Sequence, residues 1–325
     1  MKKINIAVLG ASEIAYRRFL PALMKDKRFK YVGVGYYRIE DSEKVKLFKE
    51  NYGGEIFNSF EEVLNNTDID AVYVPQPPAL HYKYGKMVLD SGKHLFMEKP
   101  FTISFDETKK LIEIANDRNL AVCENYMFRF HKQIAEFINL VNKGKIGKLN
   151  KYEVKFCFPI RQANDFRYIK ALGGGALLDC GGYTIMLSDI LFNYEGKLYP
   201  NKPIYEEGYE VDMHGSGKIV RDNVECNFYF GMNDEYSCSL KAYGDKGTLF
   251  ASRILTAPND FDVNFEYINL NNEKEIINIG KDDSFLKSIN NFYNSIVNKD
   301  VRKENIQKII RQASLIDEMI KIGGQ

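Results

Sequence analysis

Five short apolar runs within the first 125 residues constrain the fold of this chain most strongly. They occupy residues 4–10, 31–37, 71–75, 94–99 and 120–125. Near-continuous apolar runs of this length are typical of strands buried on both faces of a parallel sheet. Stretches with helical spacing separate them, at residues 42–51, 59–66, 81–92 and 104–119. Alternation of this kind implies right-handed crossovers, so we predict a doubly wound, nucleotide-binding α/β domain.

The segment after the first strand resembles a dinucleotide-binding turn. Residues 10–15 read GASEIA and approximate G-x-G-x-x-A, with serine at the second glycine position. The glycine permits a tight turn, and N–H groups at the start of the next helix would meet a pyrophosphate. A turn with only a structural role is the alternative, which its place at the head of the repeat disfavours. The predicted cofactor contacts here are Gly10, Ala11, Ser12, Glu13 and Ile14.

The end of the second strand bears on the choice of cofactor. NAD-binding domains usually have an acidic residue there for the ribose 2′-hydroxyl, whereas an arginine accommodates the 2′-phosphate of NADP. The chain instead has Tyr37 and Arg38, and its first acidic residues, Glu40 and Asp41, follow later. We therefore expect NADP(H) in preference to NAD(H), with Tyr37 and Arg38 in contact with it. A solvated Arg38 without a ligand is the alternative.

A lysine stands at the end of the fifth strand, in the segment FMEKPF at residues 96–101. Open parallel sheets bind ligands beyond the carboxyl ends of their strands. Pro100 disfavours helix at the preceding residue and so keeps Lys99 at the strand tip. We predict that Lys99 projects into the cofactor site, with Glu98 beside it. The alternative is that Lys99 is an ordinary solvent-exposed lysine without a ligand.

The second half contains a polar pair in an apolar helical stretch. Three glycines, 173–175, precede it, and Asp179 and Tyr183 stand four residues apart, which places them on one helix face. The glycines would let the backbone approach a cofactor or substrate, or would serve only as a turn into the helix. Likewise, Asp179 and Tyr183 are either site residues or a satisfied carboxylate and a half-buried phenol.

The remainder of the chain reads mainly as alternating strands, followed by amphipathic helices at 284–298 and 303–323 that we interpret as packing elements. The parallel pattern stops near residues 120–130. We therefore expect a dinucleotide-binding domain at residues 1–123 and a second domain at 124–325.

Composition excludes several functions. A net charge of +1, from 45 basic and 44 acidic residues, provides no basic excess for nucleic acid. No apolar stretch reaches the ~18 residues of a membrane span, and the N-terminus lacks a signal-peptide pattern. The five cysteines form no CxxC pair, and no metal-ligand spacing occurs. We expect a cytoplasmic protein with reduced thiols and no metal.

Several of these motifs, in this order, resemble the glucose–fructose oxidoreductase / inositol dehydrogenase (Gfo/Idh/MocA) family. They are GASEIA, PQPPALH (75–81), EKP (98–100) and GGGALLDCGGY (173–183). The resemblance implies a Rossmann domain followed by an α/β domain on a large, mainly antiparallel open sheet, through which members form dimers or tetramers. It also implies that Gln76, Pro77 and His81 line the cofactor site near Lys99. Many members have histidine where this chain has Tyr183, which indicates a tyrosine-using subgroup.

Within the family, the chain looks most like NADPH-dependent 3-ketoreductases of nucleotide-linked deoxysugars. The segments that carry this likeness are 124–133, 165–179 and 253–261. It implies a homo-oligomer that reduces a C-3 keto group, and we expect Asn125 at the cofactor. Arginine forks suit a diphosphate, so Arg167 is a candidate for binding that of the substrate, with an ordinary ion pair as the alternative. The alternatives are a dehydrogenase of a free sugar, polyol or cyclic diol, and a dinucleotide-binding sensor without catalysis.

The chemistry expected of the polar pair follows from carbonyl reduction, which needs a hydride on carbon and a proton on oxygen. A free tyrosine has a pKa of ~10, and a nearby ammonium lowers it. We predict that Tyr183 donates the proton and contacts the substrate, and that Lys99 tunes Tyr183 and polarises the carbonyl. Asp179 is expected to orient a substrate hydroxyl or Lys99.

Overall fold

The computed structural model describes residues 3–37 and 41–323. It divides into two compact units: Met1–Tyr126 with Phe285–Ala313, and Met127–Ser284 with Ser314–Gln325. Each unit is built on its own sheet.

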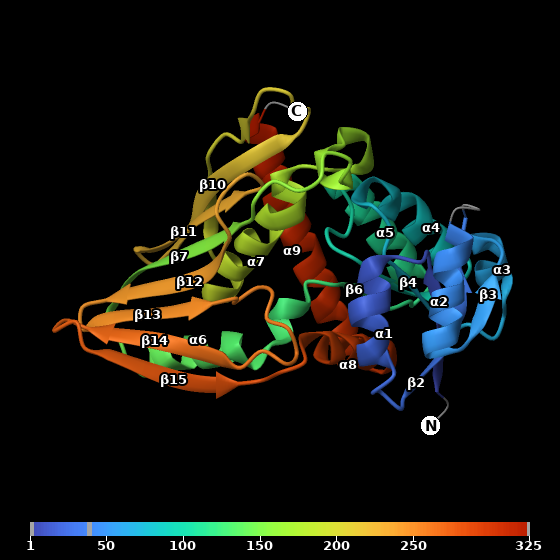
Figure 1. The fold of residues 1–325 in the computed structure, drawn as a ribbon, viewed down its shortest axis with the longest axis horizontal. Coiled ribbons are helices and arrows are strands. Elements are labelled where there is room, and N and C mark those ends of the chain that lie inside the picture. The colour runs from blue at the N-terminus through green and yellow to red at the C-terminus, as the bar shows by residue number, and fades with distance from the viewer. Residues whose placement is uncertain (1–2, 38–40, 324–325) are drawn as a thin grey trace. The chain divides into compact units, whose positions relative to one another are not determined.

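The first unit contains a six-stranded sheet in the order β3-β2-β1-β4-β5-β6, in which every neighbouring pair is parallel. Figure 1 labels β2, β3, β4 and β6 of this sheet. This is the strand order of a Rossmann sheet, in which the order of successive strands reverses between β1 and β4. Its strands are β1 (Ile4–Leu9), β2 (Phe29–Gly35), β3 (Glu55–Phe57), β4 (Ala71–Val74), β5 (His94–Met97) and β6 (Val122–Glu124). Its helices are α1 (Leu20–Leu23), α2 (Ser42–Tyr52), α3 (Phe60–Asn65), α4 (His81–Asp90) and α5 (Phe105–Asp117). The parallel α/β prediction is therefore confirmed.

Two apolar cores cover the two faces of this sheet. Along β1, Ala7 and Leu9 belong to one core, whereas Ile6 and Val8 belong to the other. This division follows from the strand, in which successive side chains point to opposite faces. The first core contains residues of α3, α4 and α5, and the second contains residues of α1 and α2.

A C-terminal helix completes the second core. In α8 (Ser284–Val297), Phe292 stacks on Phe96 of β5 at a ring separation of 5.0 Å, and Ile289 and Tyr293 are buried beside it. The expected division at residues 123/124 placed this helix in the second domain, but its apolar stripe packs in the first unit. The following helix, α9 (Lys299–Gly323), contributes Ile306 and Ile309 to the other core of the first unit.

The second unit contains a nine-stranded sheet. Its order is β15-β14-β13-β12-β7-β11-β10-β8, with β9 paired to β10, and only β7 and β11 run parallel. The strands are β7 (Leu149–Cys157), β8 (Lys197–Pro200), β9 (Ile204–Tyr205), β10 (Asp212–Arg221), β11 (Val224–Gly231), β12 (Ser237–Gly244), β13 (Gly247–Ser252), β14 (Val263–Asn269) and β15 (Lys274–Gly280). The mainly antiparallel second sheet is thereby confirmed.

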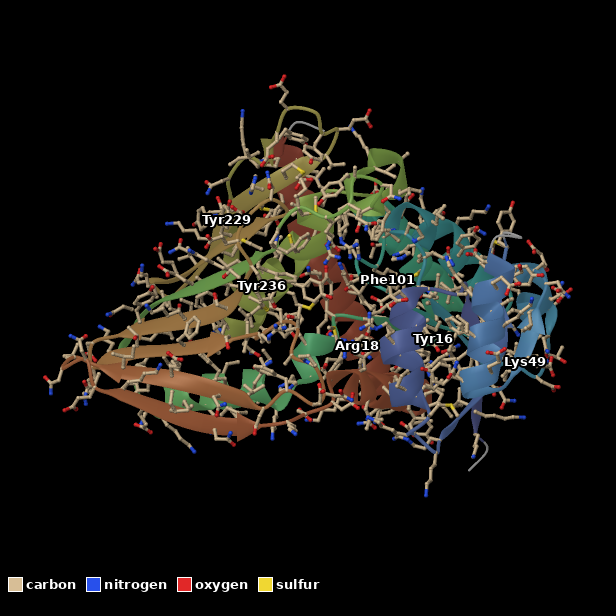
Figure 2. The ribbon with its side chains drawn as sticks, in the orientation of Figure 1. Tyr16, Arg18, Lys49, Phe101, Tyr229 and Tyr236 are labelled. Carbon is tan, nitrogen blue, oxygen red and sulfur yellow. The ribbon has the colours of Figure 1, made fainter. Side chains whose placement is uncertain are left out.

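Alternation along these strands buries one face more than the other. Cys238, Leu240 and Ala242 of β12 are buried, while the residues between them are partly exposed. The second unit contains α6 (Lys132–Asn142), α7 (Gly182–Leu191) and the part of α9 from Ser314 onward. Helix α7 packs on β7, β10 and β11. Figure 2 marks Tyr229 of β11 and Tyr236 just before β12.

Two further expectations concern reduced thiols and membrane-spanning segments. All five cysteines lie within the described residues as buried thiols. None of the helices formed by residues 3–37 and 41–323 combines the length and the hydropathy that a membrane-spanning segment requires.

Candidate active site

The turn after β1 has a backbone conformation that favours glycine. Gly10 has φ of +108°, and a Cβ built there would lie 2.1 Å from Gln76 Nε2. The Gly10 N–H donates to the Gly35 carbonyl at 2.9 Å, and Ser12 Oγ accepts the Ala15 N–H at 3.2 Å. Ser12 therefore caps the helix that starts beyond the carboxyl end of β1. Residues at this turn fit a dinucleotide, because a helix start at this position offers N–H groups to a pyrophosphate.

The other predicted contacts of the adenosine end lie beyond β2. Tyr37 is 68% exposed, and its ring lies 6.1 Å from that of Phe60. Arg38, the predicted partner of a 2′-phosphate, lies outside the described residues.

The loop after β4 is held by side chains that bond to the backbone. Gln76 Nε2 donates to the Leu9 carbonyl, which ties the ends of β1 and β4 together. His81 is fully buried, with its ring nitrogens 2.7 Å from the Gln76 and Pro100 carbonyl oxygens. Burial lowers the pKa of His81 to about 4, so the imidazole is neutral at physiological pH. His81, expected to line the cofactor site, exposes no surface, and its imidazole lies between the Gln76 and Pro100 carbonyl oxygens. Its place at the cofactor stays a prediction. Gln76 and Pro77 remain partly exposed.

Glu98, which is partly exposed, and Asn125, which is buried, form a hydrogen-bond network at the carboxyl end of β5. Glu98 Oε1 accepts hydrogen bonds from the Tyr73 hydroxyl and from Asn125 Nδ2, both at 2.6 Å. Burial raises the pKa of Glu98, and these two donors oppose that effect. Asn125 Oδ1 accepts from Ser288 Oγ at 2.9 Å, and Asn125 is only 1% exposed. Asn125 was expected at the cofactor, but its amide is used to hold Glu98.

Lys99 follows this network directly. It is partly exposed, and its peptide bond to Pro100 is cis. The next residue, Phe101 (Figure 2), is 1% exposed, and its N–H donates to Glu124 Oε1 at 2.6 Å. Buried groups on both sides thus hold the backbone of Lys99 at the strand tip, as the Glu-Lys-Pro sequence predicts.

Tyr183 lies in the second unit, in the first turn of α7. It is 8% exposed, and its hydroxyl lies 4.0 Å from Met127 Sδ. Its ring lies 5.6 Å from the ring of Phe128 and 5.4 Å from that of Phe156. Aromatic and thioether groups of the same unit therefore surround much of this phenol and shield it from water.

Asp179 is the centre of an ion-pair arrangement that the sequence did not reveal. Arg167 Nε donates to Asp179 Oδ2 at 2.6 Å, and Arg167 Nη1 donates to Asp165 Oδ1 at 3.1 Å. These carboxylates raise the pKa of Arg167, although burial opposes them. Arg167 was predicted to bind a substrate diphosphate; in the structure its guanidinium is committed to two carboxylates of the chain and orients Asp179.

The glycine run packs against the chain itself. A Cβ on Gly174 would lie 2.4 Å from the Arg167 carbonyl oxygen, and one on Gly175 would lie 2.3 Å from Asp212 Oδ1. Asp212 Oδ2 accepts the N–H of Leu177 at 2.7 Å. These contacts favour the alternative in which the glycines form the turn into the helix. They also identify Asp212, which sequence reasoning missed because it lies 35 residues away from its partner.

The segment between Asp179 and Tyr183 is not a regular α-helix. Residues Leu177–Gly181 form a π-helical turn that leads into α7. Such turns are rare and frequently occur at functional sites. The two side chains therefore share a continuous helical segment, but their relation differs from the regular α-helical spacing that the sequence predicts.

Arg129 is a second residue that the sequence did not single out as a site. Its Nε and Nη2 atoms are buried and have no hydrogen-bond partner among the described residues. Its guanidinium lies 4.5 Å from the centre of the Phe130 ring. This edge of a guanidinium carries two parallel N–H donors, the arrangement that grips a carboxylate or phosphate.

The predicted catalytic residues are divided between the units: Lys99 belongs to the first, and Asp179 and Tyr183 belong to the second. The first unit has the turn and strand ends at which open sheets bind dinucleotides. In the part of the chain that the structure describes, no three His, Cys, Asp or Glu residues are grouped so that they could hold a metal ion.

Comparisons with known proteins agree with this architecture over nearly the whole chain. The dTDP-3,4-didehydro-2,6-dideoxy-alpha-D-glucose 3-reductase of Actinomadura kijaniata is 30% identical over 315 residues, covering 97% of this chain and 94% of that protein. The enzyme of the same name from Streptomyces violaceoruber is 32% identical over 260 residues, 79% of this chain and 75% of that protein.

Solved structures show the same likeness. The 3-ketoreductase KijD10 from Actinomadura kijaniata, in complex with NADP and TDP-benzene, superposes with a TM-score of 0.91 at 29% identity, covering 98% of each chain. Structures of that enzyme also exist with a tyrosine replaced by phenylalanine and with a lysine replaced by alanine or glutamate.

Family profiles match both parts of the chain. Residues 4–126 match the oxidoreductase family with an NAD-binding Rossmann fold, and residues 134–250 match the GFO/IDH/MocA C-terminal domain. The protein is therefore an oxidoreductase that belongs to the GFO/IDH/MocA family.

Proposed function

We propose that this enzyme uses NADPH to reduce the C-3 keto group of a nucleotide-linked deoxysugar. The observation that carries the proposal is Tyr183, a phenol surrounded by Met127, Phe128 and Phe156 within a helical segment that also holds Asp179. A shielded phenol suits proton donation to a carbonyl oxygen. The full-length likeness to dTDP-sugar 3-reductases supports the substrate class.

In the proposed reaction, the turn at residues 10–14 of the first unit would hold NADPH, which would supply the hydride for C-3. Tyr183 Oη gives its proton to the carbonyl oxygen, so the C=O bond becomes CH–OH and a phenolate remains until solvent reprotonates it. The Lys99 ammonium stabilises the negative charge that develops on the oxygen. Asp179, oriented by Arg167, accepts a hydrogen bond from a neighbouring sugar hydroxyl and so fixes the face of the carbonyl that is reduced.

The predicted NADP(H) preference belongs to this proposal, with Tyr37 and Arg38 at the ribose 2′-phosphate and the turn at residues 10–14 at the pyrophosphate. NADP in the KijD10 structures supports it. We expect kcat/KM with NADPH to exceed that with NADH, and Arg38→Ala to reduce the ratio. Equal ratios in the wild type and the variant would remove Arg38 from the cofactor site.

A panel assay tests the activity. NADPH oxidation would be followed by nicotinamide absorbance with dTDP-linked 3-keto-deoxysugars, and NADP⁺ reduction with free sugars and polyols. We expect turnover with the linked keto-sugars. Tyr183→Phe should lose about 10²-fold or more in kcat, as expected for a lost general acid, while NADPH affinity is unchanged. Tyr199→Phe, at a 46% exposed tyrosine of β8, is the matched control. Unchanged turnover in Tyr183→Phe would refute the assignment of Tyr183.

A second candidate function, oxidation of a free sugar, polyol or cyclic diol, is favoured by one observation. Arg167, predicted to bind a diphosphate, is paired with Asp165 and Asp179. If the enzyme reduces NADP⁺ with uncharged substrates and is inactive on the linked keto-sugars, this second function is correct. Tight NADPH binding without turnover in any well would instead indicate a sensor.

Oligomerisation through the open sheet of the second unit is a further part of the proposal. The sheet has a partly exposed face along β12, where buried and partly exposed residues alternate. We expect a homodimer or homotetramer. Size-exclusion chromatography with light scattering measures the state, and a monomer at micromolar concentration would contradict the expectation.

A further inference from the structure

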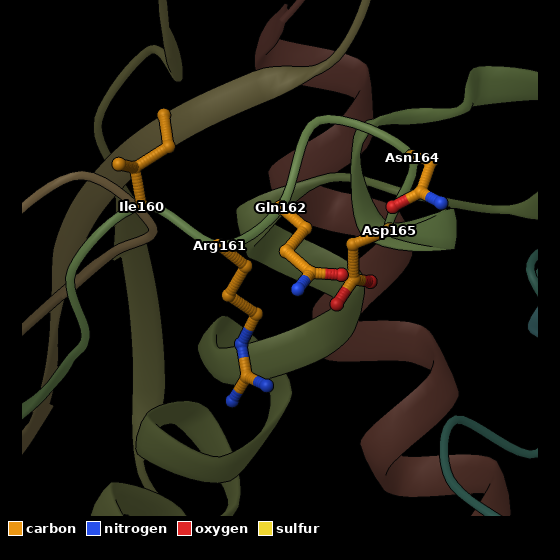
Figure 3. A pocket seen from close by; sticks show the side chains of 5 residues that line it. All are labelled: Ile160, Arg161, Gln162, Asn164 and Asp165. Carbon is orange, nitrogen blue, oxygen red and sulfur yellow. The ribbon is translucent and has the colours of Figure 1, made fainter.

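The segment after β7 lines a hollow that the catalytic proposal does not use. Its volume is about 680 Å³, within the range of small-molecule sites, and Ile160, Arg161, Gln162, Asn164 and Asp165 line it (Figure 3). All five residues belong to the second unit. In Figure 3 the side chains of Arg161, Gln162 and Asp165 extend to the same side of the segment.

Two contacts hold the arginine of this hollow in place. The Arg161 N–H donates to the Tyr168 hydroxyl at 2.8 Å, and the guanidinium lies 4.8 Å from the centre of the Phe158 ring. Tyr168 and Phe158 are both buried, so they restrain a residue that is otherwise exposed. An arginine stacked on an aromatic ring keeps the donors at the edge of its plane directed outward.

The two neighbouring arginines differ in their charge partners. Arg167 is paired with Asp165 and Asp179. Within residues 3–37 and 41–323, the side chain of Arg161 has no carboxylate partner. The guanidinium fork of Arg161 is thus available to an anion from solution, whereas that of Arg167 is not.

The hollow is connected to the candidate catalytic segment. Asp165 lines the hollow and accepts from Arg167, which in turn donates to Asp179. A ligand in the hollow therefore lies next to the ion pairs that hold Asp179. Asp165, Arg167 and Asp179 thus join the hollow to the carboxylate proposed to orient the sugar.

We propose that this hollow binds the nucleoside diphosphate of the substrate, with the Arg161 fork on a phosphate and the Gln162 amide as a further donor. This inference rests on the proposed function and specifies where the nucleotide of that substrate binds. A guanidinium matches two oxygens of one phosphate, and a charge-assisted pair of this kind is about twice as strong as a neutral hydrogen bond. The binding energy lies away from the reacting carbon, so its loss should raise KM and leave kcat nearly unchanged.

Calorimetric titration with dTDP, thymidine and NADPH tests the inference on the full chain. The variants are Arg161→Met, which removes the charge, and Arg161→Lys, which keeps the charge without the fork. Arg118→Met, which removes a cation at the end of α5 in the first unit, is the control for loss of a charge elsewhere; unlike Arg161, Arg118 is paired with Asp90. Thermal unfolding curves identify any variant that is misfolded. For Arg161→Met we expect dTDP affinity to fall about tenfold or more, with NADPH affinity unchanged. Arg161→Lys should show an intermediate loss.

The outcomes separate this inference from the proposed function. If wild type binds dTDP and Arg161→Met binds it equally well, the hollow is not the diphosphate site and the proposed function stands. If Arg161→Met weakens NADPH instead, the phosphate belongs to the cofactor and the inference is overturned. If wild type fails to bind dTDP at all, the proposed substrate class and the inference both fail. If dTDP binding depends on Arg161 but no keto-sugar is reduced, the inference stands and the proposed activity fails.

Discussion

Replacing Asp212 by asparagine tests how the chain holds the segment that carries Asp179 and Tyr183. Asp212 begins β10, and its Oδ2 accepts the N–H of Leu177 at the start of the π-helical turn. Burial raises the pKa of this carboxyl from 3.8 to about 6, while the Leu177 hydrogen bond acts in the opposite direction. At neutral pH the group is therefore ionised in a site that favours its neutral form.

The direction of the pH effect follows from proton linkage. Between about pH 4 and pH 6, the folded protein binds a proton at Asp212 that the unfolded chain does not bind. The stability contributed by this group is thus fully present below about pH 4, and it is lost as the pH rises through 6. A separation of about two pKa units corresponds to at most about 3 kcal/mol in the free energy of unfolding.

Asparagine keeps an oxygen for the Leu177 N–H and remains neutral at every pH. We therefore expect Asp212→Asn to be more stable than wild type at pH 8, by up to about 3 kcal/mol, and the difference to shrink toward zero near pH 4. Urea unfolding of both proteins across this range measures the difference, in which the titration of other groups cancels. Asp222→Asn, the same change at an 86% exposed side chain in the β10–β11 turn, is the matched control. A stability difference for Asp212→Asn that stays constant from pH 4 to pH 8 would refute the reasoning.

Three further predictions concern the two units separately. Gly10→Ala should destabilise the protein by about 1–2 kcal/mol and weaken NADPH binding, because the new Cβ would meet Gln76 and the residue has a positive φ. Fluorescence titration measures the NADPH affinity, and an unchanged affinity would contradict the assignment of this turn to the cofactor. Arg167→Met should lower the free energy of unfolding by about 3 kcal/mol and reduce kcat, because Asp179 loses its cation. Arg167→Lys should recover part of the stability and part of kcat, and equal losses in the two variants would exclude a charge effect. Arg129→Met should leave the ligand-free protein as stable as wild type or more stable, because two buried donors without acceptors are removed; a lower unfolding temperature would show that the guanidinium is satisfied.

Local patterns explain how much of the fold could be predicted. Apolar runs, helical spacing and turn residues can each be recognised within a window of ten to twenty residues. They correctly predicted the parallel sheet, the long antiparallel strands and both C-terminal helices. The β10–β11 hairpin is one example: Asp222 and Asn223 both have positive φ, which a two-residue hairpin turn requires and which these residue types tolerate. By contrast, β3, β8 and β9 contain exposed residues and form no continuous apolar run, so they were not recognised.

Local patterns do not predict which sheet an amphipathic helix packs against. The spacing in α8 predicts an apolar stripe, but nothing local says which sheet receives it. The ring of Phe292 stacks on that of Phe96, which lies nearly two hundred residues earlier in the sequence, and α8 belongs to the first unit. The boundary at residues 123/124 was drawn from the end of a local pattern, and such a pattern contains no information about a helix that returns much later.

The order of residues is enough to identify the chemical groups of the site: Lys99 at a strand tip, Asp179 and Tyr183 on one helical segment, and a motif order that indicates the family. How these polar groups are used depends on the folded chain. It paired Arg167 with Asp179, placed Asp212 beneath the π-helical turn, and enclosed His81 and Asn125 as supports. The physical reason is that backbone preference depends on neighbours in the chain. The partner of a buried polar group depends on which distant segments the packed core brings within hydrogen-bond distance of it.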